Sequence, residues 1–156
     1  MGVTRQTQVP TRWIDQGAIQ GLPIFKTTNR YQAGLIEVAI KQFINDKTNW
    51  RDMLKGKNPS IDLIKERGIV RDLTQNAVEK VLTTFHPSEV VELNEEQVTE
   101  ISYPVQEYPI KITSLSLDTH PHLEGRLMGM KGQYLIFEHG VLNVRKYGGY
   151  EVKFSY

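Results

Sequence analysis

The sequence NRYQAGLIEVAIKQFI, residues 29–44, decides the fold of the N-terminal part of this 156-residue chain. Asn29 is followed three residues later by Gln32, which is the pattern of a helix capping box. The stretch therefore predicts an amphipathic helix that begins after Asn29, with Glu37 at the margin of the apolar face. That face is made by residues at helical spacing, namely Ala33, Ile36, Ala39, Ile40, Phe43 and Ile44.

Shorter elements flank this helix. Upstream, Pro10 and Thr11 predict the start of a two-turn helix, and residues 21–27 predict a brief strand. Downstream, one short helix is expected over 61–67, with Ser60 as its cap and Gly68 as its end. A second helix is expected to begin at Asp72 or Thr74 and to end at His86-Pro87, and residues 88–106 predict an acidic, extended connector that enters a sheet. Gly34, inside the central helix, is expected to permit close packing or the close approach of another group, because glycine weakens a helix by up to about 1 kcal/mol.

The last fifty residues have the pattern of an antiparallel sheet. Apolar and polar residues alternate from 150 to 156, as in a strand with one buried face. Residues 134–137 and 141–144 flank a turn, and 110–117 and 123–128 add two further strands. We therefore predict an α+β protein with an N-terminal α/β part (1–57), a helical bridge with an acidic connector (58–106), and a C-terminal antiparallel β meander or small barrel (107–156).

Composition limits the classes of function. The chain is 39% hydrophobic and 24% charged, which is typical of a globular protein, and it has no cysteine. Disulfide scaffolds, thiolate zinc sites and cysteine nucleophiles are therefore excluded. No apolar run approaches the roughly 18 residues of a membrane span, and the N-terminal sequence has no apolar signal-peptide core. These features predict a soluble cytoplasmic protein without a membrane partner.

Charge is distributed unevenly along the chain. Residues 1–57 carry nine basic and four acidic side chains, a net charge of +5. Residues 58–109 carry four basic and ten acidic side chains (−6), and residues 110–156 carry six and four (+2). A polyanion would be attracted to the first segment and repelled by the second. The alternative is that both charge clusters are solvated surface with nothing bound.

Arg12 and Glu37 are the candidate catalytic pair. An arginine on a short helix can clamp a phosphate, and a carboxylate on a facing helix can hold a divalent metal such as Mg²⁺. Together they are a minimal arrangement for cleaving a phosphodiester. The alternative is structural, with Glu37 paired to Lys41 one turn later and the stem of Arg12 packed on Trp13.

Two further groups of residues are candidates for binding. Basic and aromatic side chains alternate around residues 131–134 and 145–150, and such a surface can hold phosphates and stack bases. These tyrosines can equally fill the sheet's core. The residues predicted to contact DNA or RNA are Arg5, Lys26, Arg30, Arg51, Lys131, Arg145 and Lys146. Asp118, His120 and His122 are a weaker candidate for a zinc site in a loop.

Several strings resemble the uncharacterised bacterial DUF2797 family across essentially the whole chain. They are GVTR (2–5), PTRWIDQGA (10–18), GLIEV (34–38), DKTNWRDMLK (46–55), KGQYLIF (131–137) and LNVRK (142–146). Members of that family usually carry a cysteine-rich N-terminal portion. The resemblance therefore implies that this chain corresponds to the C-terminal part of a longer member.

The first fifty-odd residues also resemble the second half of a GIY-YIG nuclease core. In those nucleases a strand ends in Tyr-Ile-Gly, an arginine follows on a short helix, and a metal-binding glutamate lies on the next long helix. By this resemblance Gly2 corresponds to the glycine, Arg12 to the arginine and Glu37 to the glutamate. The two tyrosines of the motif have no counterpart in this sequence, so the general-base chemistry is missing.

The resemblances imply a nucleic-acid-associated protein with a truncated GIY-YIG-like core. As an enzyme it would be a metal-dependent nuclease, with Arg12 as phosphate clamp and Glu37 as Mg²⁺ ligand, but without the tyrosines we do not expect this chain alone to hydrolyse its substrate. The alternatives are a non-catalytic DNA- or RNA-binding module and a protein-interaction scaffold that uses the acidic bridge.

Overall fold

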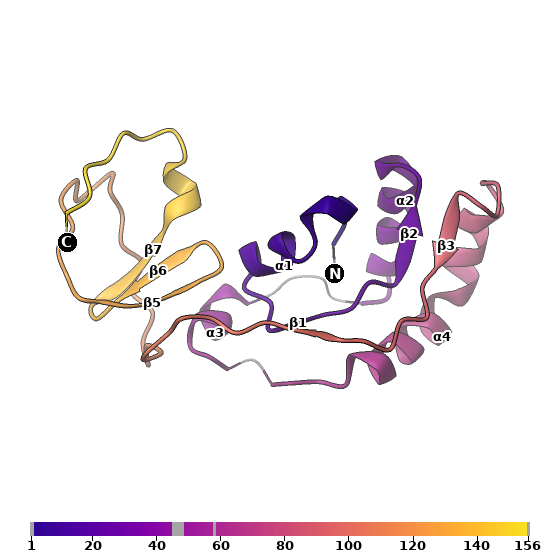
Figure 1. Cartoon of the computed structure of the whole chain (residues 1–156), viewed down its shortest axis with the longest axis horizontal. Coiled ribbons are helices and arrows are strands. Elements are labelled where there is room, and N and C mark those ends of the chain that lie inside the picture. The colour runs from indigo at the N-terminus through magenta and orange to yellow at the C-terminus, as the bar shows by residue number, and fades with distance from the viewer. Residues whose placement is uncertain (1, 45–48, 58, 156) are drawn as a thin grey trace. The chain divides into compact units, whose positions relative to one another are not determined.

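The structure, a computed structural model, describes residues 2–44, 49–57 and 59–155 (Figure 1). The chain divides into two compact units. Unit 1 comprises residues 1–13, 19–48 and 59–101, and unit 2 comprises residues 14–18, 49–58 and 102–156. Both helices and antiparallel strands are present, which confirms the predicted α+β class. Each unit has its own core and is described separately.

Helix α2 (Arg30–Lys41) organises unit 1. Its predicted capping box is confirmed, because the Asn29 side chain accepts from the Gln32 amide while the Gln32 side chain accepts from the Asn29 amide. The apolar face of α2 packs against strand β2 (Phe25–Thr27) and helix α4 (Leu63–Leu82) (Figure 1). This packing buries a core made of Ile36, Ala39, Ile40, Val78 and Val90.

Unit 1 begins with the 3-10 turn η1 (Gln6–Gln8), followed by helix α1 (Thr11–Asp15). The last two residues of α1 belong to unit 2. Two strand pairs complete unit 1. The predicted strand over 21–27 is two strands, β1 (Gln20–Gly21) and β2. Strand β3 (Val90–Glu92) pairs antiparallel with β2, and β4 (Thr99–Glu100) pairs antiparallel with β1. The acidic segment thus supplies the strand partners of the basic N-terminal segment.

The two helices predicted between residues 61 and 85 are one helix, α4. Its cap is Asp62, whose side chain accepts from the amides of Ile64 and Lys65, so the prediction of Ser60 was wrong. Gly68 does not end the helix. A Cβ at Gly68 would meet nothing within 4 Å, and the apolar residues of α4 that follow it, beginning with Val70, pack in the unit 1 core, so the backbone stays helical at a modest cost in stability.

Unit 2 is built on an antiparallel meander of β5 (Leu127–Lys131), β6 (Tyr134–Phe137) and β7 (Gly140–Asn143), in the order β5-β6-β7 (Figure 1). Helix α3 (Trp50–Leu54) packs on it, and the 3-10 turn η2 (Val144–Tyr147) follows β7. The predicted meander is therefore correct in type. Its buried core consists of Met53, Leu54, Ile136 and Val141.

The sheet has fewer strands than predicted. Residues 110–117 contribute a single parallel bridge, Ser114 to Val141, and residues 150–155 form no strand although their side chains alternate. The outer edge of β5 is occupied by residues 104–106 and that of β7 by residues 113–115. No edge of this meander is left for residues 150–155, and Phe154 is 77% exposed. Tyr156, the end of the predicted strand, lies outside the described residues.

Candidate functional site

Glu37 forms the structural pairing that was the alternative to metal binding. Its carboxylate lies 3.2 Å from the Lys41 ammonium one turn along α2, and its side chain is 23% exposed. Nowhere in residues 2–44, 49–57 and 59–155 do three His, Asp or Glu side chains gather as a metal site would require. Among the described residues, Glu37 is therefore paired with a lysine and does not belong to a cluster of three potential metal ligands. Nor does the His120–His122 loop gather zinc ligands.

The other candidates of unit 1 are cations for which no carboxylate partner is found among the described residues. Arg5, Lys26 and Arg30 are exposed, Arg12 is half-buried, and none makes an ion pair within the part of the chain that the structure describes. The unit as a whole carries ten basic and eleven acidic side chains, a net charge of −1. The positive N-terminal segment is thus balanced by the acidic segment that folds onto it.

Unit 2 contains the remaining four candidates and carries nine basic and seven acidic side chains, a net charge of +2. Arg51 and Arg145 are exposed and make no ion pair with any described residue. The Lys146 ammonium donates to the Asp118 carboxylate at 2.5 Å, and this ion pair neutralises its positive charge. Lys131, in contrast, is buried, with an exposed fraction of 2%.

Arg51 belongs to a stack of planar groups. Its guanidinium lies 4.4 Å from the centre of the Trp50 ring, and the Trp50 ring is stacked on Tyr134 with centroids 5.7 Å apart. Trp50 begins α3 and Tyr134 begins β6, so the stack joins the helix to the sheet. Both rings are half-buried and pack against the unit 2 core, which fixes their orientation.

Lys131, at the end of β5, lies in a cage of two tyrosine rings. Its Nζ is 5.4 Å from the centre of the Tyr103 ring and 5.2 Å from that of Tyr108. The amine makes no hydrogen bond and no ion pair with the described residues. Burial lowers the pKa of Lys131, because the charged form loses its hydration without gaining a counter-ion. We call Tyr103, Tyr108 and Lys131 the lysine cage.

Neighbouring backbone fixes the Tyr103 wall of the lysine cage. The Tyr103 hydroxyl donates to the carbonyls of Ala18 (2.8 Å) and Ile14 (3.1 Å). Burial, with smaller contributions from Tyr108 and Asp15, raises the pKa of Tyr103 to about 12, so its hydroxyl stays protonated.

Two glycines with left-handed backbone lie near the cage, one against the Tyr108 ring and one directly after Lys131. Gly56 has φ +69°, and a Cβ there would lie 2.9 Å from the Tyr108 ring. Gly132 has φ +59° in the β5–β6 turn, and a Cβ there would lie 3.1 Å from both the Asp15 carbonyl oxygen and the Gly17 amide nitrogen.

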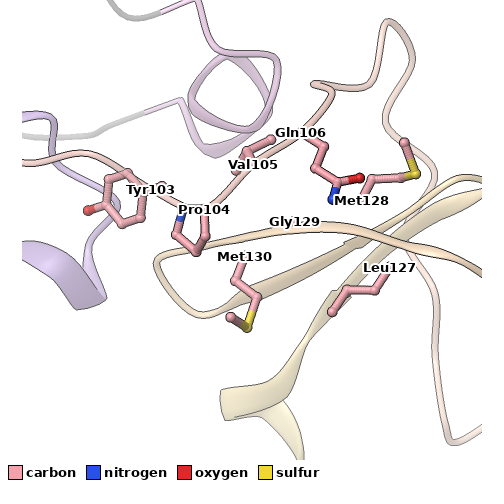
Figure 2. A pocket seen from close by; sticks show the side chains of 8 residues that line it. All are labelled: Tyr103, Pro104, Val105, Gln106, Leu127, Met128, Gly129 and Met130. Carbon is pink, nitrogen blue, oxygen red and sulfur yellow. The ribbon is translucent and has the colours of Figure 1, made fainter. Parts of the chain in front are cut away.

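A hollow of about 420 Å³ lies beside the cage, and Tyr103 belongs to both. Residues 103–106 form one side and residues 127–130 of β5 the other (Figure 2). The two segments approach closely at Gly129, where a Cβ would lie 2.6 Å from the Val105 Cα. Figure 2 shows Tyr103 and Pro104 at one end of the hollow and Gln106 and Met128 at the other.

A third polar cluster, around the Tyr147 hydroxyl, consists of groups that hydrogen-bond to one another. The Tyr147 hydroxyl accepts from the Leu117 amide and the Lys146 ammonium and donates to Ser116. The Ser116 bond, followed by that of Lys146, lowers the pKa of Tyr147. Every hydrogen-bonding position of this hydroxyl is taken, so the cluster fastens residues 116–118 to η2.

Sequence reasoning missed the lysine cage. A lysine directly before the glycine of a hairpin turn is typical of a solvated position, and residues 102–108 have no recognisable motif. The alternation of β5 was a usable signal, since Lys131 shares its face with the buried Gly129.

Comparison with known proteins identifies the family. The family model described as protein of unknown function (DUF2797) matches residues 1–152. No curated protein and no solved structure matches the chain. The match covers nearly all of both units, including Lys131, Trp50 and Arg51. The chain therefore belongs to the DUF2797 family.

Proposed function

We propose that this protein binds single-stranded nucleic acid through unit 2, without hydrolysing it. The observation that carries the proposal is the stack in which Arg51 lies over Trp50 and Trp50 over Tyr134. Proteins that hold single strands combine unpaired cations, which contact phosphates, with aromatic groups, on which bases stack. Arg51 is exposed and has no carboxylate partner among the described residues, so its charge is available to a phosphate.

Further cations support the proposal. Arg145 is exposed on η2, which a hydrogen bond from the Val144 amide to the Gln133 carbonyl holds beside the start of β6. Tyr134 is the next residue after Gln133, so Arg145 and the stack belong to the same end of the meander. The net charge of unit 2, +2, favours a polyanion, whereas that of unit 1 does not.

Hydrolysis is the part of the sequence-based interpretation that we leave out of the proposal. The GIY-YIG resemblance assigns Glu37 to a metal, but this carboxylate is engaged by Lys41. The acidic-bridge scaffold hypothesis is also less well supported, because Glu92 is bound by Arg71 and the segment supplies strands β3 and β4 of unit 1.

Fluorescence anisotropy with a labelled single-stranded oligonucleotide tests the proposal. Arg51→Ala is expected to weaken binding severalfold, since one phosphate contact and the cation over Trp50 are lost together. Arg71→Ala is the matched control: it removes the same charge from a residue that Glu92 already neutralises. Equal effects of the two substitutions would contradict the proposal, and so would Mg²⁺-dependent cleavage of the oligonucleotide that Glu37→Gln abolishes.

A further inference from the structure

The segment after η2 has the residue pattern of a strand but pairs with no strand among the described residues. Tyr150, Val152 and Phe154 alternate with polar residues, and they are 53%, 65% and 77% exposed. Such alternation is typical of a strand with one apolar face. The meander of the same chain does not supply the neighbouring strand, because residues 104–106 and 113–115 already lie along its outer edges.

The backbone of this segment can accept a partner strand. Residues 151–153 make no backbone hydrogen bond to any described residue, and exposed N–H and C=O groups of an extended segment are a template for pairing with another chain. The segment is held at its start, where the Tyr150 hydroxyl donates to Asp118 at 2.5 Å and the Tyr150 ring lies edge-on to the buried Tyr147 ring. Because one end is anchored, pairing costs less conformational entropy than it would for an unattached peptide.

The charges of the segment are complementary to those of a second copy of itself. In an extended strand Glu151 and Lys153 point to the face opposite the apolar one, and neither makes an ion pair with a described residue. In an antiparallel pair centred on Val152, Glu151 of each copy lies directly opposite Lys153 of the other. The same register places Tyr150 opposite Phe154, so the apolar side chains of both copies share one face.

Other registers of this pair are less favourable. A shift by one residue places apolar side chains opposite charged ones, because the side-chain period of a strand is two. A shift by two residues places Glu151 opposite Glu151 in one direction and Lys153 opposite Lys153 in the other, and like charges directly opposite each other are destabilising. The sequence of the segment thus favours a single register with a second copy.

We propose that residues 150–154 pair with the same residues of a second copy of this chain, as an antiparallel ribbon centred on Val152. A pair of such short strands buries less than the roughly 1,200 Å² at which stable protein interfaces begin, so the association is weak and reversible. Neither Arg51 nor the stack of Trp50 on Tyr134 takes part, so the proposal is independent of nucleic-acid binding.

Disulfide trapping in the full chain tests the proposal, because the sequence has no cysteine and one introduced thiol reports one position. In the proposed pair, Val152→Cys brings two Cα atoms within about 4.5–5.5 Å, a separation that a disulfide can bridge. Ser155→Cys is the matched control from the same exposed segment: its two Cα atoms would be about 20 Å apart, six residues along the strand. In a glutathione redox buffer, we expect Val152→Cys to form the covalent dimer at least about tenfold faster than Ser155→Cys.

Charge reversal in the Val152→Cys background tests the register. Glu151→Lys and Lys153→Glu each place like charges opposite each other, so each should slow trapping severalfold. Both substitutions in one chain exchange the two charges and should restore trapping. Lys111→Glu is the control: it changes the net charge as Lys153→Glu does, at an exposed position of the same unit, and should leave the rate unchanged.

Equal rates of trapping at positions 152 and 155 would overturn the proposal, since they would indicate random collision. Slowing by either charge reversal that the double substitution does not restore would also overturn it. So would the absence of covalent dimer at both positions, which would leave the segment to a strand of a different protein. All substituted side chains are exposed, and an unchanged far-ultraviolet circular dichroism spectrum checks that each variant is folded.

Discussion

Trp50 and Tyr134 lie face to face, with their ring planes only 2° apart, although one begins a helix and the other a strand. The stack ties α3 to the meander and carries the exposed guanidinium of Arg51 at 4.4 Å. One pair of residues therefore links the stability of unit 2 to its proposed function.

Tyr134→Ala should destabilise unit 2 by about 2–4 kcal/mol, because it removes a half-buried ring and the stacking of that ring on Trp50. Tyr134→Phe keeps the ring and should change the free energy of unfolding by less than about 1 kcal/mol. Urea unfolding of the full chain, followed by tryptophan fluorescence, measures both. If the two variants were equally stable, the stack would have no structural role.

Two glycines of unit 1 should respond in opposite directions to alanine. A Cβ at Gly34 meets nothing within 4 Å, so Gly34→Ala should stabilise α2 by about 0.5–1 kcal/mol. A Cβ at Gly21 would collide with the Trp13 ring, so Gly21→Ala should destabilise unit 1 by about 1–3 kcal/mol. Thermal unfolding of both variants checks the pair, and destabilisation by Gly34→Ala would show that this glycine is needed for close packing.

Much of the fold could be predicted from local sequence. The capping box of Asn29 and Gln32 and the apolar face of α2 are short-range patterns, and β6 and β7 are joined by a short turn. Gly34 shows the limit of such reasoning. Its presence in a helix indicated close approach, but only the arrangement of the surrounding elements reveals the open space beside it.

Long-range contacts account for what could not be predicted. The alternation from Tyr150 to Phe154 is typical of a strand, yet residues 104–106 and 113–115 occupy the edges of the meander. Lys131 looks like a surface lysine because the tyrosines that enclose it come from a distant segment with no motif. The charge gradient likewise disappears in three dimensions, since β3 pairs with β2 within one unit.

At alkaline pH, Lys131 and Tyr103 of the lysine cage should change the free energy of unfolding in opposite directions. Lys131 has a lowered pKa in the folded protein, so the folded state binds fewer protons than the unfolded state and stability rises as pH approaches 10.5. Tyr103 has a raised pKa, so its contribution is complete below pH 10.0 and is lost as pH rises toward about 12. Urea unfolding at successive pH values should show both effects. Lys131→Met should remove the rise and Tyr103→Phe should reduce the fall; identical curves for all three proteins would contradict this account.

Asp118 should hold the C-terminal segment in place. It accepts from Lys146 and, at 2.5 Å, from Tyr150, and these bonds lower its pKa. Asp118→Asn should therefore speed amide hydrogen exchange in residues 148–155, while exchange in β6 is unchanged. Lowering the pH through the depressed pKa of Asp118 should have the same effect in the wild type, because protonation removes the charge. Unchanged exchange in residues 148–155 would mean that other contacts hold this segment.

The salt dependence of oligonucleotide affinity tests the central claim most directly. For single strands, the logarithm of the binding constant falls against the logarithm of salt concentration with a slope of about −0.7 per phosphate contacted. Contacts from Arg51 and Arg145 predict a slope of about −1.4 or steeper, which becomes shallower by about 0.7 in Arg51→Ala and is unchanged in Arg71→Ala. Binding that is insensitive to salt, or a slope that Arg51→Ala leaves unaltered, would contradict the claim that unit 2 holds a nucleic acid through these residues.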